Sequence, residues 1–220
     1  MISLNDFEKQ YDQLLFSNAN TIFPSNEINF LMGKNGCGKT TLFKCLSGLE
    51  NYKGTILYDD KNLNEIRDEL FVLWDDTPFY LKLSGYDNLI LFSEKKEKRS
   101  QIIKMAQDYL PDKTLKRKVK TYSYGQKKKL SLILLDILKP KYILMDEISN
   151  GLDIDTMEML QNKIDNIKNE STIILTGHQF NFYQKIADNV FVKNNDKIIK
   201  VEYDKNDPSS LEKIYHEKIN

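Results

Sequence analysis

A glycine-rich turn with one lysine lies near the start of the chain. Its residues, Gly33, Lys34, Asn35, Gly36, Cys37, Gly38, Lys39, Thr40 and Thr41, fit the pattern G-x-x-x-x-G-K-[ST]. In this pattern backbone N–H groups surround phosphate oxygens at a helix N-terminus. We expect Lys39 to contact the β- and γ-phosphates of ATP and Thr40 to bind Mg²⁺. A glycine turn with an incidental lysine is the weaker interpretation, because chance produces the pattern in about one chain in a hundred.

Two adjacent carboxylates could complete this chemistry. Asp146 and Glu147 directly follow the apolar run 142–145. Mg²⁺ needs an oxygen ligand from the protein, and an attacking water needs a base to orient it. We therefore assign Asp146 to the metal and Glu147 to the water, and the pair predicts ATP hydrolysis. The alternative is an ordinary acidic turn after a strand.

Apolar periodicity and the breaks between apolar runs define the elements that would position these residues. Strands alternate with helices, which favours an α/β fold with a P-loop NTPase core and a mainly parallel sheet. We expect strands over residues 27–32, 55–58, 70–74, 142–145 and 172–176, a closing strand pair over 189–203, helices over 39–47, 130–138 and 157–167, and a helical insert over 86–109.

The composition fits one folded domain without a strong overall electrostatic field. Of 220 residues 40% are hydrophobic, and 32 basic residues balance 32 acidic ones. We therefore expect no nucleic-acid partner, and we interpret the basic residues of 113–129 as a solvated helix face. Charged residues near the N-terminus argue against a secretory signal, and the longest apolar stretch, 132–138, is far shorter than the ~20 residues of a membrane span. A cytoplasmic location is expected.

Three further motifs resemble those of the ATP-binding subunits of ABC transporters. Tyr122-Ser123-Tyr124-Gly125-Gln126 is similar to the family's signature L-S-G-G-Q, with Ser123, Gly125 and Gln126 matching. Residues 149–153, which end in Asp153, are similar to the D-loop, and His178 follows a strand as the family's switch histidine does. Because the order and spacing of all these motifs are the family's, the resemblance covers nearly the whole chain.

The resemblance implies an architecture and a mechanism. It implies one ABC ATPase domain over 1–220, with a core of 1–74 and 123–220, a helical subdomain over 75–122 and an antiparallel β subdomain. Two such domains would meet head to tail, most simply as a homodimer. Ser123, Tyr124, Gly125 and Gln126 would then face the partner's ATP, while Lys39, Glu147 and His178 would act in catalysis. Tyr11 lies where the family stacks an aromatic ring on adenine; Phe16 and a plain surface role for Tyr11 are the alternatives.

The chain departs from the family pattern at two positions. Asp75 stands where the family has a glutamine, so it could bind Mg²⁺ or accept from water, but it cannot donate as an amide does. Tyr124 replaces the first glycine of the signature, where backbone approaches nucleotide. We therefore expect slow hydrolysis. Cys37, inside the loop, could be a reactive thiol or only a small side chain.

Membrane transport would require a second protein. In the family an integral membrane subunit docks on a groove beside the helical subdomain, here about residues 77–91, although their apolar side chains could equally form the insert's own core. The short chain resembles the motors of exporters. A soluble ABC-type ATPase and a nucleotide-binding regulatory module with weak hydrolysis are the alternatives, and the transported substance cannot be read from this sequence.

Overall fold

The central sheet has six strands, and all but the last run parallel. The structure is a computed structural model that describes residues 1–75, 79–93 and 97–219. The strand order is β5-β6-β7-β3-β8-β9, and β9 pairs antiparallel with β8. This confirms the predicted mainly parallel α/β fold. The strands are β3 (Ile28–Met32), β5 (Leu70–Leu73), β6 (Tyr142–Met145), β7 (Thr172–Thr176), β8 (Asn189–Asn194) and β9 (Lys197–Val201).

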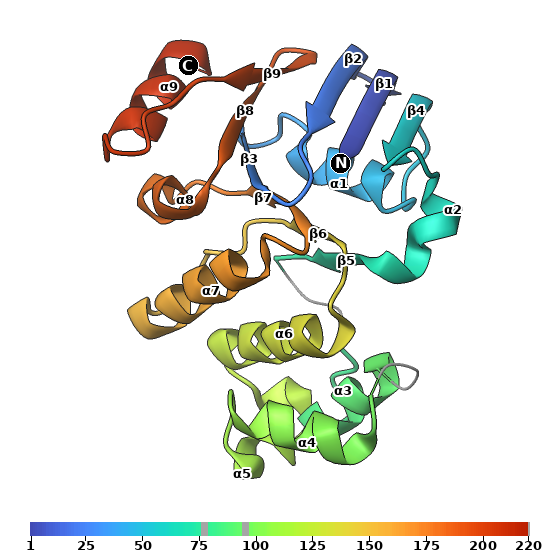
Figure 1. The fold of residues 1–220 in the computed structure, drawn as a ribbon, viewed down its shortest axis with the longest axis vertical. Helices are drawn as coiled ribbons and strands as arrows, with labels where there is room; N and C mark the ends of the chain where they lie inside the picture. Colours follow the sequence, from blue (N-terminus) through green and yellow to red (C-terminus); the bar gives the residue numbers. More distant parts are fainter. Residues whose placement is uncertain (76–78, 94–96, 220) are drawn as a thin grey trace.

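A second, antiparallel sheet covers helix α1 (Lys39–Leu46) near the N-terminus (Figure 1). It has the order β2-β1-β4, with β1 at Ile2–Gln10, β2 at Leu14–Phe23 and β4 at Lys53–Tyr58. Alternate apolar residues of these strands point inward and pack with α1 and the central sheet, in a cluster that includes Phe7, Phe16 and Phe43. This sheet therefore presses α1, and the loop before it, against the central strands.

A helical region lies on the opposite side of the central sheet from the antiparallel strands (Figure 1). After the short helices α2 (Leu63–Ile66) and η1 (Arg67–Glu69), the chain enters β5 and then forms α3 (Gly85–Ser93), α4 (Arg99–Gln107), α5 (Asp112–Leu115), η2 (Val119–Thr121) and α6 (Tyr124–Leu138). Helices α3 and α4 pack on α6, and Leu115 of α5 and Val119 of η2 belong to the same apolar cluster. The predicted helical insert 86–109 thus corresponds to α3 and α4 in the described part of the chain.

Helix α6 begins six residues earlier than its apolar pattern predicts. A capping box explains the difference: Ser123 Oγ accepts the N–H of Gln126 at 3.2 Å, and Gln126 Oε1 accepts the N–H of Ser123 at 3.1 Å. The two bonds satisfy donors that a helix start leaves free. The first turn of α6 is therefore polar, and hydrophobic periodicity alone does not reveal it.

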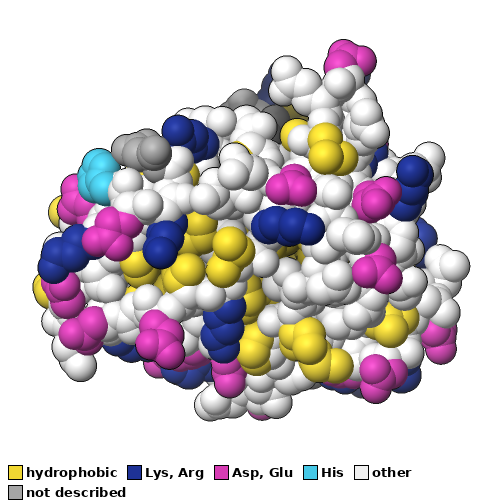
Figure 2. Space-filling view, turned by 90° about the horizontal axis from the view of Figure 1, so that it is seen from above, with side chains coloured by type: hydrophobic (Ala, Val, Ile, Leu, Met, Phe, Trp, Pro, Cys, Tyr) yellow, Lys and Arg dark blue, Asp and Glu magenta, His cyan; other side chains and the backbone are white. Residues whose placement is uncertain are grey.

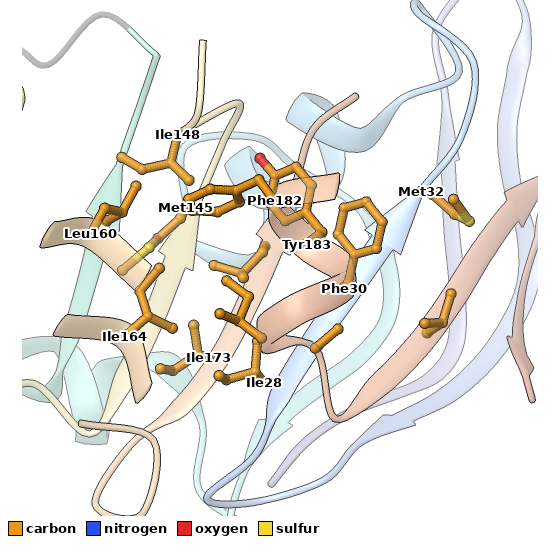
Figure 3. Packing of buried hydrophobic residues seen from close by; sticks show 14 of the residues in the cluster. Ile28, Phe30, Met32, Met145, Ile148, Leu160, Ile164, Ile173, Phe182 and Tyr183 are labelled. Atoms are coloured by element: carbon orange, nitrogen blue, oxygen red, sulfur yellow. The ribbon is translucent and has the colours of Figure 1, made fainter. Parts of the chain in front are cut away.

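The face of the sheet opposite α1 is covered by α7 (Ile154–Ile167), α8 (Phe180–Ile186) and α9 (Ser210–Lys218), and neither α8 nor α9 was predicted. Figure 3 shows the core beneath them, where the Tyr183 ring of α8 stacks on Phe30 of β3 at 4.3 Å between centroids. The Tyr183 hydroxyl donates to the main-chain oxygen of Thr176 at 2.7 Å. A Cβ on Gly177 would lie 2.0 Å from that hydroxyl. Packing in the core therefore determines the path of the chain just after β7.

Candidate functional site

The predicted phosphate loop connects β3 to α1 at the carboxyl edge of the parallel strands. Gly38 has φ 106°, which favours glycine, and a Cβ there would lie 3.1 Å from the Phe16 ring. A Cβ on Gly33 would lie 2.7 Å from Cys37 Sγ. The two glycines therefore let the loop fold tightly, and α1 begins at Lys39 with its first N–H groups at the loop.

A cleft of about 550 Å³ opens at this loop. The residues lining it come from the loop, from α1 and from the segments after β6 and β7: Asn35, Gly36, Gly38, Lys39, Thr40, Thr41, Glu147, Asn150 and His178. Lys39 is only 6% exposed, and its ammonium donates to the main-chain oxygens of Gly33 at 2.8 Å and Lys34 at 3.1 Å. The loop thus holds its own lysine at the cleft, where a cation can meet phosphate oxygens.

Two oxygen donors for a metal lie side by side. Thr40 Oγ1 donates to Asp146 Oδ2 at 2.7 Å, and Thr176 Oγ1 donates to Asp146 Oδ1 at 2.6 Å. Among the described residues no group of three or more His, Cys, Asp or Glu side chains could hold a metal. Mg²⁺, however, commonly takes one or two protein oxygens and completes its shell with phosphate and water. The pair Thr40 and Asp146 fits that requirement.

Glu147 is held in an unusual backbone conformation beside the metal pair. Its φ is 51°, in the left-handed region that a glutamate seldom occupies, and its N–H donates to Thr176 Oγ1 at 3.2 Å. Asn150 Nδ2 donates to Glu147 Oε2 at 3.4 Å. Burial raises the pKa of Glu147, with neighbouring Asp146 and Asp75 adding to the effect and Lys39 opposing it. A carboxylate with a raised pKa is suited to accept a proton from water.

His178 lies between the lysine and the glutamate. Its Nε2 is 3.4 Å from Lys39 Nζ and 3.4 Å from Glu147 Oε1. Burial, followed by the charge of Lys39, lowers the pKa of His178, so the imidazole is neutral at physiological pH. Its contact with Glu147 is therefore not an ion pair. A neutral imidazole with one donor and one acceptor nitrogen can orient both a phosphate oxygen and a water.

The signature residues lie at the start of α6. Ser123 is exposed and Gly125 is partly exposed, and neither is among the residues that line the subunit's own cleft. Tyr124 is half-buried, and its hydroxyl donates to the Asp75 carboxylate at 2.5 Å. Asp153 caps α7 by accepting the N–H of Thr156 at 2.8 Å. The predicted roles of these residues stay predictions.

Tyr11 occupies the turn between β1 and β2, with half of its side-chain surface exposed. Its ring centroid lies 4.4 Å from Lys9 Nζ, and it is not among the residues lining the cleft. The alternative, Phe16, is fully buried under Gly38 and so cannot stack on a base. Adenine stacking by Tyr11 stays a prediction.

Three residues that support the site did not stand out in the sequence. Thr176 bridges Asp146 and Glu147, Asn150 contacts Glu147, and Lys128 donates to the main-chain oxygens of Trp74 and Asp75 at 3.0 and 2.8 Å. Thr176 is the last residue of an apolar strand, and a polar residue at the carboxyl end of a parallel strand is the signal that could have marked it. Lys128 follows the signature in a run of three lysines, which hides it.

Comparison with known proteins agrees with this geometry. Residues 16–150 match the family model described as "ABC transporter". The lantibiotic transport ATP-binding protein SrtF of Streptococcus pyogenes is 28% identical, with 100% of this chain and 97% of SrtF aligned. The methionine import ATP-binding protein MetN of Clostridioides difficile is 27% identical over 91% of this chain and 68% of its own length.

Solved structures show the same fold. The ATP-binding subunit of an ABC transporter superposes with a TM-score of 0.83 at 19% identity, covering 98% of this chain and 92% of that subunit. CbiO1 from Clostridium perfringens superposes with a TM-score of 0.75 at 20% identity, covering 98% and 94%. Motifs, cleft, sequence relatives and fold thus agree, and the chain belongs to the ABC transporter family, as one of its ATP-binding subunits with ATPase activity.

Proposed function

We propose that two copies of this ATPase, paired head to tail, power a membrane transporter of the exporter type. One observation carries the pairing: Lys39, Glu147 and His178 share a cleft that Ser123 and Gly125 do not line. A signature that serves no phosphate in its own subunit is available to the phosphate of another. Because each copy would offer one cleft and one signature, a symmetric pair completes two sites.

The start of α6 has the properties of an anion-binding surface. Helix α6 runs for 15 residues, and its N-terminal N–H groups carry partial positive charge. A Cβ on Gly125 would meet one atom within 4 Å, Thr156 Oγ1 at 4.0 Å, so a neighbouring molecule can approach this backbone closely. The Ser123 hydroxyl accepts from Gln126 and keeps its own hydrogen free to donate. These donors suit the γ-phosphate of a partner's ATP.

The cleft supplies the remaining chemistry of phosphoryl transfer to water. Lys39 would bind the β- and γ-phosphates, and Thr40 with Asp146 would hold Mg²⁺, which neutralises developing charge on the phosphates when bound. Glu147 would orient and deprotonate the attacking water, while His178 would keep water and γ-phosphate aligned. Both side chains line the same cleft as the lysine, which supports these roles.

A membrane subunit would dock on the apolar surface beside α3. Tyr80, Leu81, Leu91 and Phe92 are each between 41% and 56% exposed, and the rings of Tyr80 and Phe92 lie 5.9 Å apart. Phe79 and Tyr86, in contrast, are buried in the helical core. The predicted segment 77–91 therefore divides between core and surface, and its residues 77 and 78 lie outside the described part of the chain. The exposed residues therefore offer apolar side chains to a protein partner.

The proposal also covers the direction of transport and the location of this subunit beside its membrane partner. Within the described residues no helix is long and apolar enough to cross a bilayer, so transport needs a second protein, with this subunit on the cytoplasmic face. This chain spans nearly all of the lantibiotic transport relative but about two-thirds of the methionine import relative, and the exporter type is our proposal for the direction. On the face in Figure 2, Lys and Arg side chains mix with Asp and Glu, which supports the absence of a nucleic-acid partner.

Complementation between two inactive variants tests the head-to-tail pair. Lys39→Ala removes the phosphate-loop cation, and Ser123→Phe blocks the signature, so each variant alone should show no ATPase activity. In an equal mixture half of the pairs are mixed, and each mixed pair has one intact site, so about a quarter of the wild-type rate should return. The two folded variants would be mixed without ATP, and ATP would then be added. A mixture that stays inactive would contradict head-to-tail pairing.

Copurification tests the membrane partner. Leu81→Asp should abolish capture of an integral membrane protein from detergent-solubilised membranes of the source cell, because a charge would be buried at the contact. Ile22→Asp is the matched control, since Ile22 is 58% exposed on the distant antiparallel sheet and should leave capture intact. If the wild-type ATPase captures no membrane protein, the soluble ABC-type ATPase becomes the better reading.

A further inference from the structure

The two departures from the family pattern contact each other. Tyr124 donates its hydroxyl hydrogen bond to Asp75 Oδ1 at 2.5 Å, and the main-chain oxygen of Asp75 lies 3.3 Å from the same hydroxyl. A phenol and a carboxylate at this separation form a charge-assisted hydrogen bond, which is stronger than one between neutral groups. The glutamine and glycine that these residues replace could not form it, because glycine has no side chain.

The first turns of α6 hold the chain that follows β5 at this point. Lys128, one helical turn after Tyr124, is 2% exposed and donates to the main-chain oxygens of Trp74 and Asp75. Its ammonium also lies 5.2 Å from the centroid of the Tyr124 ring. On the other side, a Cβ on Gly151 would be 3.4 Å from that ring. Tyr124 therefore links three segments: the signature, the residues after β5 and the D-loop.

The charge of Asp75 is within electrostatic reach of the catalytic centre without being part of it. It contributes to raising the pKa of Glu147, although burial contributes more. Yet Asp75 is not among the residues that line the cleft at the phosphate loop. As Tyr124 holds it, the Asp75 carboxylate therefore does not line the cleft.

We propose that the Asp75 carboxylate has two mutually exclusive partners, the Tyr124 hydroxyl and a Mg²⁺ ion bound with ATP, so that Tyr124 controls how tightly the subunit holds the metal–nucleotide complex. This inference rests on the proposed ATP- and Mg²⁺-binding function. Binding of Mg²⁺ by Asp75 would release Tyr124 and free the signature turn. Because the coupling is reciprocal, breaking the Tyr124–Asp75 bond would increase the affinity for Mg²⁺ by the same factor. Tyr124 is in this sense a positioning residue.

Tyr124→Phe tests the competition, because it removes the hydroxyl and keeps the ring. The affinity of the purified chain for a non-hydrolysable ATP analogue would be measured by calorimetry with Mg²⁺ and with EDTA. Affinity should rise about three- to tenfold with Mg²⁺, which is the effect of losing one hydrogen bond of ordinary net strength at an exposed position, and should not change in EDTA. An equal change in both conditions, or none, would overturn the proposal.

Two further variants separate the proposal from general destabilisation. Asp75→Asn keeps an acceptor for Tyr124 but loses the charge that attracts Mg²⁺, so adding Tyr124→Phe to it should have no further effect. Tyr122→Phe is the matched control: its hydroxyl donates to the main-chain oxygen of Thr114 at 2.8 Å, away from Asp75, and its loss should leave the Mg²⁺ dependence unchanged. A wild-type chain that binds no nucleotide would refute the proposed function; binding that ignores Tyr124→Phe would refute the competition alone.

Discussion

Thr176→Val should weaken both the fold and the ATPase, because one hydroxyl bonds to two residues of the candidate site. Thr176 is fully buried, donates to Asp146 at 2.6 Å and accepts from the Glu147 N–H at 3.2 Å. Valine keeps the shape and loses both bonds. A hydrogen bond to a buried charge contributes about 1.5–3 kcal/mol, and an unpaired buried N–H costs about 1–3 kcal/mol. Since Asp146 keeps its bond from Thr40, we expect a loss of about 3 kcal/mol of unfolding free energy.

The assay combines urea unfolding, phosphate release and nucleotide binding. A loss of this size corresponds to a melting temperature about 6 to 12 °C lower for a chain of this length. The hydrolysis rate should fall at least about tenfold, because the left-handed backbone of Glu147 loses its partner. Nucleotide binding through Lys39 should persist. Thr172→Val, at a buried site on the same strand, is the control, and Thr176→Ser should rescue. If Thr176→Val cost no more than Thr172→Val in stability and rate, the reasoning would be wrong.

Three other predictions address the charges and side chains around the cleft. Burial and the charge of Asp75 raise the pKa of Glu147, so the ATPase rate should fall with acidification at a pH above the ordinary glutamate range. Asp75→Asn should move this acidic limb of the pH–rate profile to lower pH. An acidic limb that does not move would count against an effect of Asp75 on Glu147. Maleimide should block ATP binding at partly exposed Cys37 and ATP should protect, whereas buried Cys45, whose pKa burial raises to about 11, should stay unlabelled; equal inhibition of Cys37→Ala would exclude this site. Tyr124→Gly should increase the phosphate-release rate by removing a Cβ and a phenol from the signature, and an unchanged rate would show that Tyr124 does not slow hydrolysis.

The parallel core was predictable from sequence because its strands are buried on both faces. The run 142–145 is apolar at every position and became β6 with the predicted bounds, as did 172–176 for β7. The strands β1 and β2 were not located individually, because charged and amide side chains lie between their buried apolar residues. Local periodicity is weak there, and pairing between distant residues decides the structure.

The candidate site was predictable where one residue type has a fixed role at a fixed spacing. Lys39, Thr40, Asp146, Glu147 and His178 all follow from motifs, and the structure brings them to the same cleft or to its metal pair. Contacts between motifs were not predictable. Two separate departures from the family pattern gave no sign that they touch, because they are 49 positions apart in the sequence and only the fold sets their distance.

Gly177, next to His178, limits which substitutions this protein can accept. A methyl group there would overlap the Tyr183 hydroxyl at 2.0 Å, and that ring in turn stacks on Phe30. In related sequences, alanine at position 177 should therefore occur only where position 183 has lost its aromatic ring. The packing of α8 thus limits which residues position 177 can carry, and paired substitutions at positions 177 and 183 should mark this limit.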